Sequence, residues 1–181
     1  ITAHRRENLG EPMHHMFRAI RRIVEEHPDI RAIYPIHMNP VVREAADAEL
    51  GGCEHIKIIE PLDVVDFHNF LAHSYMILTD SGGIQEEAPS LGKPVLVLRD
   101  TTERPEAVEA GTVRLVGTDE EKVFQTAYKL LTDEKEYKAM AEAVNPYGDG
   151  KSAARIVDYL LWKERISDKK PMKFIANKES L

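Results

Sequence analysis

Apolar and polar positions follow two different periods along the chain. Met13, Phe17, Ile20 and Val24 recur at the spacing that puts one face of a helix against a core. Short continuous apolar runs separate such segments, and runs of this kind are typical of strands buried on both faces. The runs cover residues 30–36, 55–59, 75–79, 94–98 and 112–116. Helical patterns cover residues 40–50, 63–74, 83–91, 103–111, 119–131, 133–143 and 152–166.

The alternation of strands and helices predicts an α/β fold, a Rossmann-like doubly wound parallel sheet in one domain over residues 1–166. In such sheets ligands bind beyond the carboxyl ends of the strands, so the loops after the strands are the places to look for chemistry. Residues 167–181 are rich in lysine and polar residues, and we expect a poorly ordered tail there.

The first residues have no initiator methionine and resemble the end of a strand that runs into a charged loop. We therefore expect the chain to be part of a larger protein, with a preceding region missing.

Composition narrows the function classes. The 181 residues are 43% hydrophobic and 30% charged, which is ordinary for a soluble globular protein. The net charge of −7 argues against nucleic acid or an anionic membrane as the main partner. Cys53 is the single cysteine, so no internal disulfide can form, which fits a reducing compartment. No run approaches the roughly 20 apolar residues of a membrane span. No cluster has metal-ligand spacing, so we expect neither a metal nor a cofactor.

The stretch Thr79–Gly83 (TDSGG) lies between an apolar strand and a helical pattern. Free backbone N–H groups and the helix dipole favour an anion at such a point. Gly82 and Gly83 would let the backbone approach a phosphate closely, because neither carries a Cβ. Ser81 can cap the helix or donate to a phosphate oxygen. The alternative is a tight turn with a capping serine and no ligand.

Two carboxylates follow, Glu86 and Glu87, which we expect within the first turn of the helix. One carboxylate can accept hydrogen bonds from both hydroxyls of a ribose. The alternative is that both are partners of the helix dipole. The loops at residues 2–8 and 98–106 also follow strands, and their charged side chains suit a charged, hydroxylated ligand. Solvated loops with local salt bridges are the other interpretation.

Three strings make the sequence resemble a known family. TAHRREN (residues 2–8), TDSGGIQEEAPSLGKP (residues 79–94) and NPYGDGKSAARI (residues 145–156) resemble the non-hydrolysing UDP-N-acetylglucosamine 2-epimerases, and the similarity spans about residues 2–166. That family has the two-domain GT-B architecture, and this chain is similar to its carboxyl-terminal domain only.

The resemblance implies a cytoplasmic isomerase of cell-envelope polysaccharide biosynthesis, a homodimer when full length. Such an enzyme interconverts UDP-N-acetylglucosamine and UDP-N-acetylmannosamine by anti elimination of UDP and its re-addition. Most of the family's acids and bases lie in the amino-terminal domain, so we expect the isolated chain to be inactive.

The resemblance also implies roles for single residues. His4 would lie in the catalytic cleft beside the diphosphate, and Arg5 and His37 would reach a second, regulatory UDP-N-acetylglucosamine. UDP would be bound by Phe67, Ser81, Gly82, Gly83, Glu87 and Arg104. From the residues alone, the core-aromatic interpretation of Phe67 is favoured over the functional one, and His37 could equally be a loop histidine that caps a helix.

Two other function classes stay open. The chain could be the UDP-sugar-binding domain of a related GT-B glycosyltransferase or hydrolysing epimerase, because domain architecture alone does not separate these. It could also be a sugar-nucleotide-binding module without catalysis. The strings at residues 2–8 and 79–94 favour the non-hydrolysing epimerase.

Overall fold

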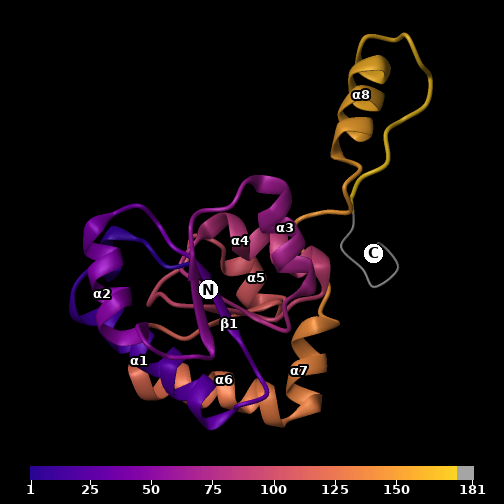
Figure 1. Cartoon of the computed structure of the whole chain (residues 1–181). Helices are drawn as coiled ribbons and strands as arrows, with labels where there is room; N and C mark the ends of the chain where they lie inside the picture. Colours follow the sequence, from indigo (N-terminus) through magenta and orange to yellow (C-terminus); the bar gives the residue numbers. More distant parts are fainter. Residues whose placement is uncertain (175–181) are drawn as a thin grey trace. The chain divides into compact units, whose positions relative to one another are not determined.

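The computed structural model describes residues 1–174 (Figure 1). The chain divides into two compact units, Ile1–Ala143 and a second unit that begins at Val144. The predicted domain of residues 1–166 with a separate tail stays a prediction. Residues 167–174 of that tail contain neither helix nor strand, and residues 175–181 lie outside the described residues.

Each predicted strand and helix is present, with strands that are shorter at their ends. The first unit contains η1 (Arg6–Asn8), α1 (Glu11–Glu26), β1 (Ala32–Pro35), α2 (Pro40–Leu50), β2 (Ile56–Ile59), α3 (Val64–His73), β3 (Ile77–Thr79), α4 (Gly82–Glu87), η2 (Ala88–Leu91), β4 (Val95–Val97), α5 (Pro105–Glu109), β5 (Val113–Leu115), α6 (Glu120–Thr132) and α7 (Glu134–Ala141). The second unit contains α8 (Ser152–Lys163). No helix in residues 1–174 is both long enough and apolar enough to cross a membrane.

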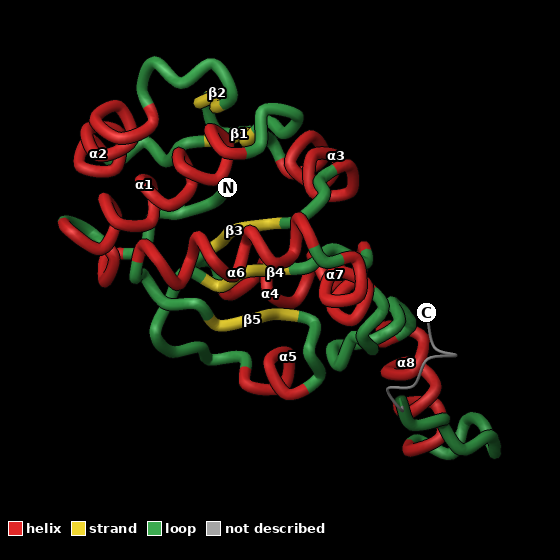
Figure 2. The backbone as a smooth tube through the Cα atoms, turned by 90° about the horizontal axis from the view of Figure 1, so that it is seen from below, coloured by secondary structure: helices red, strands yellow, loops and turns green. Residues whose placement is uncertain are grey.

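All of the paired strands are parallel. β1 pairs with β2, and β3, β4 and β5 form a second sheet in that order, side by side in Figure 2. The segment Ile1–Ala3 connects the two sheets. The Thr2 N–H donates to the Leu78 carbonyl at 2.9 Å, and the Ile1 nitrogen donates to the Ile33 carbonyl at 2.8 Å. Thr2 therefore forms an isolated parallel bridge with Thr79, and the expectation that the first residues end a strand stays a prediction.

The spatial order is thus β2, β1, Ile1–Ala3, β3, β4, β5. The chain runs from Ile1–Ala3 to β1 and β2 on one side of this segment. It then crosses to the other side, where β3, β4 and β5 follow in order. This is the Rossmann order, and its topological switch point lies beside the central segment, where ligands bind in such folds.

Helices cover both faces of this sheet. Helices α1 and α6 pack together on one face, and α4 and α5 lie on the other (Figure 1). Phe17 of α1, Phe124 of α6 and Leu96 of β4 share one buried apolar cluster. The doubly wound α/β fold predicted from the sequence is confirmed for the first unit.

Local chemistry explains where the helices begin and end. The Asn39 side chain accepts the Val41 N–H at the start of α2, as predicted, and Gly92 ends η2 with a left-handed backbone (φ 65°). Helix α4 begins at Gly82, one residue earlier than expected. The expectation that Glu86 and Glu87 lie in its first turn is therefore wrong. Both lie in its last turn, where they cannot be partners of the positive end of the helix dipole.

Candidate functional site

A cavity of about 460 Å³ opens at the carboxyl ends of the strands. We call it the switch-point cavity. Its lining comes from the segment after Ile1, from the ends of β1, β2 and β3, and from α3 and α4: Thr2, His4, Pro35, Ile36, His37, Met38, Pro61, Leu62, Phe67, Ser81 and Ile84. Four predicted site residues meet there: His4, His37, Phe67 and Ser81. The other five lie outside its lining: Arg5, Gly82, Gly83, Glu87 and Arg104.

Two histidines form one wall of the switch-point cavity. The rings of His4 and His37 stack with centroids 4.9 Å apart and planes 8° apart. His37 Nδ1 also accepts the Asn39 N–H at 3.1 Å, so His37 supports the start of α2 as well, which was its alternative role. Arg5, expected to join His37 in a second ligand site, lies outside the lining of the cavity, and its guanidinium lies 3.6 Å from Glu103.

Phe67 is not a core aromatic. It is half-buried on α3 and lines the cavity, whereas the core is built from other aromatic residues such as Phe17 and Tyr34. An aromatic face at the edge of a cavity is available to a flat ligand group such as a nucleobase. The core interpretation of Phe67 is therefore wrong, and its contact with a base stays a prediction.

Backbone and hydroxyl groups at the start of α4 are the candidate anion cradle. Ser81 precedes the helix, and its side chain makes no capping hydrogen bond within the described residues, so the predicted capping role is not used. A Cβ at Gly82 would overlap the Glu103 carboxylate, whose oxygen lies directly against this residue. A side chain at this position would displace the Glu103 carboxylate, so glycine lets an anionic group lie against the backbone here. Gly83 has more room, because a Cβ there would lie 3.5 Å from Glu87.

Ion pairs fill the space beside this cradle. Arg99 is nearly buried and donates to Glu7 at 2.6 Å and to Glu103 at 2.5 Å. A hydrogen bond from its own backbone N–H lowers the pKa of Glu103, and Arg99 lowers it further against the opposing effect of burial. Arg104 donates to Glu86. The local salt bridges that were the other interpretation of this loop are thus present. A diphosphate would have to compete with these carboxylates for Arg99 and Arg104.

Glu87 faces helix α3. Its Oε2 lies 3.0 Å from His68 Nε2, and both side chains are about half exposed. The carboxylate is accessible at the rim between α3 and α4, so the geometry permits contact with a ligand that extends from the switch-point cavity. The sequence did not single out His68, because only the fold brings it next to Glu87.

Sequence reasoning also missed Asp80 and Asn8. The Asp80 side chain is fully buried, and its Oδ2 accepts hydrogen bonds from the backbone N–H groups of His4 and Arg5 and from Asn8 Nδ2. Asn8 Nδ2 also donates to the Leu98 carbonyl at the end of β4. One carboxylate therefore fixes the loop that carries His4 to the end of β3. The signal was present in the sequence as an aspartate that directly follows a buried strand.

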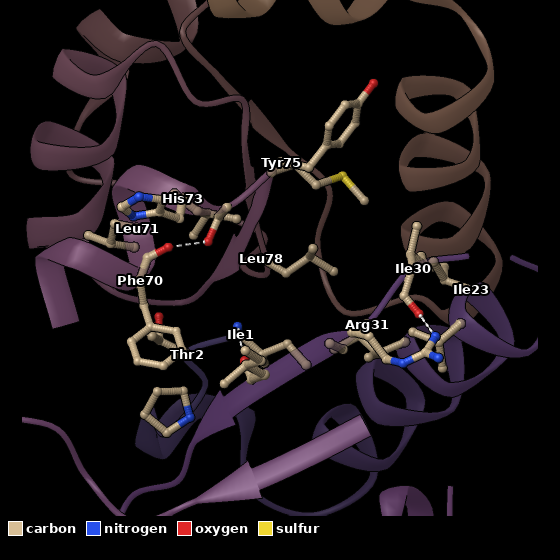
Figure 3. A pocket seen from close by; sticks show the side chains of 18 of the residues that line it. Ile1, Thr2, Ile23, Ile30, Arg31, Phe70, Leu71, His73, Tyr75 and Leu78 are labelled. Carbon is tan, nitrogen blue, oxygen red and sulfur yellow. Dashed lines mark hydrogen bonds between the residues drawn. The ribbon is translucent and has the colours of Figure 1, made fainter. Parts of the chain in front are cut away.

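A second cavity, of about 360 Å³, lies toward the amino-terminal ends of β1 and β3 (Figure 3). Its walls are mainly apolar, with Ile23, Leu71 and Leu78 among them, and the Arg31 guanidinium at its edge donates to the Ile30 carbonyl. Of the predicted site residues it contains only Phe67. Polar groups do not converge there as they do at the carboxyl ends, so the switch-point cavity is the better candidate ligand site. Within the described residues, no group of three or more His, Cys, Asp or Glu could hold a metal ion.

Comparison with known proteins agrees with this geometry. The family model described as UDP-N-acetylglucosamine 2-epimerase matches residues 1–161. The chain belongs to the UDP-N-acetylglucosamine 2-epimerase family. It is 63% identical over 174 residues to the UDP-N-acetylglucosamine 2-epimerase of Bacillus subtilis. The aligned region covers 96% of this chain and 46% of the relative. It is 52% identical over 160 residues to the protein of the same name from Escherichia coli K12. That alignment covers 88% of this chain and 43% of the relative.

Solved structures of epimerase-family proteins share the fold. The S. aureus MnaA–UDP co-structure matches with a TM-score of 0.90 and 56% identity over 96% of this chain and 48% of that one. The UDP-GlcNAc 2-epimerase from Neisseria meningitidis bound to UDP-GlcNAc matches with a TM-score of 0.84 and 46% identity, over 88% of this chain and 43% of that one. The chain spans about half the length of the curated relatives it matches. An epimerase of this family thus has about as many residues again outside the region that matches this chain.

Proposed function

We propose that this chain is the UDP-binding, carboxyl-terminal domain of an enzyme that interconverts UDP-N-acetylglucosamine and UDP-N-acetylmannosamine by UDP elimination and re-addition. The observation that carries the proposal is the switch-point cavity, where His4, Phe67 and Ser81 converge beside a backbone that already accommodates a carboxylate at Gly82. Family membership supports the same substrate class. The enzyme works in the cytoplasm and serves cell-envelope polysaccharide biosynthesis.

Each part of UDP has a candidate partner. The uracil packs on Phe67, and the ribose hydroxyls donate to Glu87 at the rim between α3 and α4. The diphosphate takes hydrogen bonds from Ser81 and from the backbone N–H groups of Gly82 and Gly83, because these groups lie at the start of a helix. His4 lies on the diphosphate side of the cavity. Arg104 lines the sugar–diphosphate side and keeps Glu86 as its carboxylate partner.

The reaction itself needs groups outside this chain. Epimerisation at the C2 carbon of the sugar removes a proton from one face and returns it to the other, which takes at least one correctly placed acid–base group on each side. The carboxylates near the cradle are engaged elsewhere, Glu86 by Arg104 and Glu103 by Arg99. An amino-terminal domain, missing from this chain, supplies the second half of the cleft and most of the acid–base groups.

Two further features belong to the proposal for the longer protein. A second UDP-N-acetylglucosamine binds beside the first as a regulator and contacts Arg5 and His37. The longer protein works as a homodimer. The stacking of His37 on His4 gives a direct route by which a ligand at the second position would affect the first.

Calorimetric titration of UDP into the chain tests the proposal. We expect measurable but weak binding, because half of the cleft is absent. Glu87→Ala should raise the dissociation constant about 10- to 150-fold, since hydrogen bonds to a charged group contribute about 1.5–3 kcal/mol. Glu134→Ala is the matched control: Glu134 is also an exposed, ion-paired glutamate, but it lies on α7. Equal UDP affinity in Glu87→Ala and the control would refute the proposed contact between Glu87 and the ribose. No binding by the unmodified chain would refute the proposed function.

A further inference from the structure

Asp80 carries an unusual combination of burial and incomplete hydrogen bonding. Its side chain is fully buried at the end of β3, and Oδ2 accepts three hydrogen bonds, from the His4 and Arg5 backbones at 2.9 and 2.8 Å and from Asn8 Nδ2 at 3.1 Å. Within residues 1–174, the other oxygen, Oδ1, is buried and has no hydrogen-bond partner. A buried carboxylate oxygen without a partner is destabilising, so its retention calls for a physical reason.

The His4 ring lies close to that oxygen. His4 Nδ1 is 4.0 Å from Asp80 Oδ1, which is about 1 Å longer than a hydrogen bond. The ring also forms part of the wall of the switch-point cavity. The unsatisfied acceptor and a ring nitrogen that can donate to it are therefore neighbours.

Contacts on two sides hold the His4 residue. Its imidazole is nearly parallel to that of His37, with centroids 4.9 Å apart, and His37 itself accepts the Asn39 N–H. The backbone N–H of His4 is bound to Asp80 Oδ2, which keeps the base of the side chain in place. A hydrogen bond from Nδ1 to Oδ1 requires a shift of about 1 Å from this arrangement.

We propose that Asp80 is a positioning residue that sets the tautomer of His4. The carboxylate accepts a hydrogen bond from Nδ1–H, so the neutral ring keeps its proton on Nδ1 and presents the lone pair of Nε2 to the cavity. In the function proposed above, on which this inference rests, the Nε2 lone pair then accepts a hydrogen bond from a hydroxyl or N–H group of the sugar nucleotide. Asp80 acts through His4 and does not touch the ligand. A carboxylate that fixes the tautomer of a histidine through one ring nitrogen leaves the other nitrogen defined for chemistry.

Nitrogen-15 NMR of the ligand-free chain tests the tautomer directly. With ¹⁵N-labelled histidine, two-bond proton–nitrogen correlations at about pH 8.5, about two units above the usual histidine range, distinguish the two neutral forms. We expect the Nδ1–H form for His4 in the unmodified chain. The Nε2–H form there would overturn the proposal, and this result does not depend on any variant or on UDP binding.

Asp80→Asn provides the decisive comparison. The Asn oxygen can take the place of Oδ2 and keep the three hydrogen bonds, while its NH2 group faces His4 Nδ1 as a donor. The variant should therefore reverse the His4 tautomer to Nε2–H. Asn8→Ala is the control, because it removes one hydrogen bond to the carboxylate without changing what faces His4, and it should keep the Nδ1–H form. Retention of Nδ1–H in Asp80→Asn would also overturn the proposal.

The readouts separate this inference from the function on which it rests. If the unmodified chain shows the Nδ1–H form but does not bind UDP, the proposed function fails and the tautomer assignment stands. If it binds UDP with His4 in the Nε2–H form, the proposed function stands and the role of Asp80 is refuted.

Discussion

Removal of the Phe67 ring should weaken UDP binding by a predictable amount. Stacking of a base on an aromatic side chain contributes about 1–3 kcal/mol, so Phe67→Ala should raise the UDP dissociation constant about 5- to 140-fold. The ring is half-buried and lines the cavity, so its loss removes a contact surface with limited effect on the core. Calorimetric titration measures the change, and thermal unfolding checks that the variant is folded.

The same helix provides the matched control for this prediction. Phe70 lies three residues further along α3, is 39% exposed and lines only the apolar second cavity. Phe70→Ala should leave the UDP dissociation constant within about twofold of the unmodified chain. Inorganic pyrophosphate, which has no base, should bind Phe67→Ala as it binds the unmodified chain. Weaker UDP binding by Phe70→Ala together with unchanged binding by Phe67→Ala would move the base to the other cavity and refute this reasoning.

Three further predictions concern stability and activity. Tyr34→Phe should lower the free energy of unfolding by about 1–3 kcal/mol in denaturant titrations, because the buried Tyr34 hydroxyl donates to the Ala3 carbonyl, which would lose its partner. The pKa of Glu103 is lowered in the folded chain, so the ionised Glu103 stabilises the fold. This stabilisation is complete above pH 4.5, the usual pKa, and is lost as the pH falls through the lowered pKa. Glu103→Gln should therefore remove that part of the acid sensitivity of unfolding. The isolated chain should catalyse no solvent deuterium exchange at the sugar C2 carbon by NMR, and exchange would place the acid–base groups in this domain.

The fold could be predicted from the sequence because each element carries a strong local pattern. The apolar run at residues 94–98 is long enough to be buried on both faces, and β4 lies at its centre. Asn39 and Gly92 bracket their helices as expected. The start of α4 was less certain, because Gly82 and Gly83 have equal freedom, and only the extended backbone of Ser81 (ψ 132°) decides that the helix begins at Gly82.

The site could be predicted only in part. Loops that follow parallel strands meet at one edge of the sheet, and this general rule was sufficient to bring His4, His37 and Ser81 together. The pairing of Glu86 with Arg104 depends on how helix α4 packs against the loop before α5, which no local pattern encodes. Asp80 looks like a surface turn residue in the sequence, and its burial results from three loops that are far apart along the chain.

Amide chemical-shift mapping with UDP tests the central claim most directly. The ¹⁵N-labelled chain is titrated with UDP, and each assigned backbone signal reports whether its surroundings change. We expect the largest changes at the carboxyl ends of the strands, at His4, His37, Ser81, Gly82 and Gly83. Largest changes at Tyr75 and Ile77 beside the second cavity, or no changes at millimolar UDP, would refute binding at the switch-point cavity.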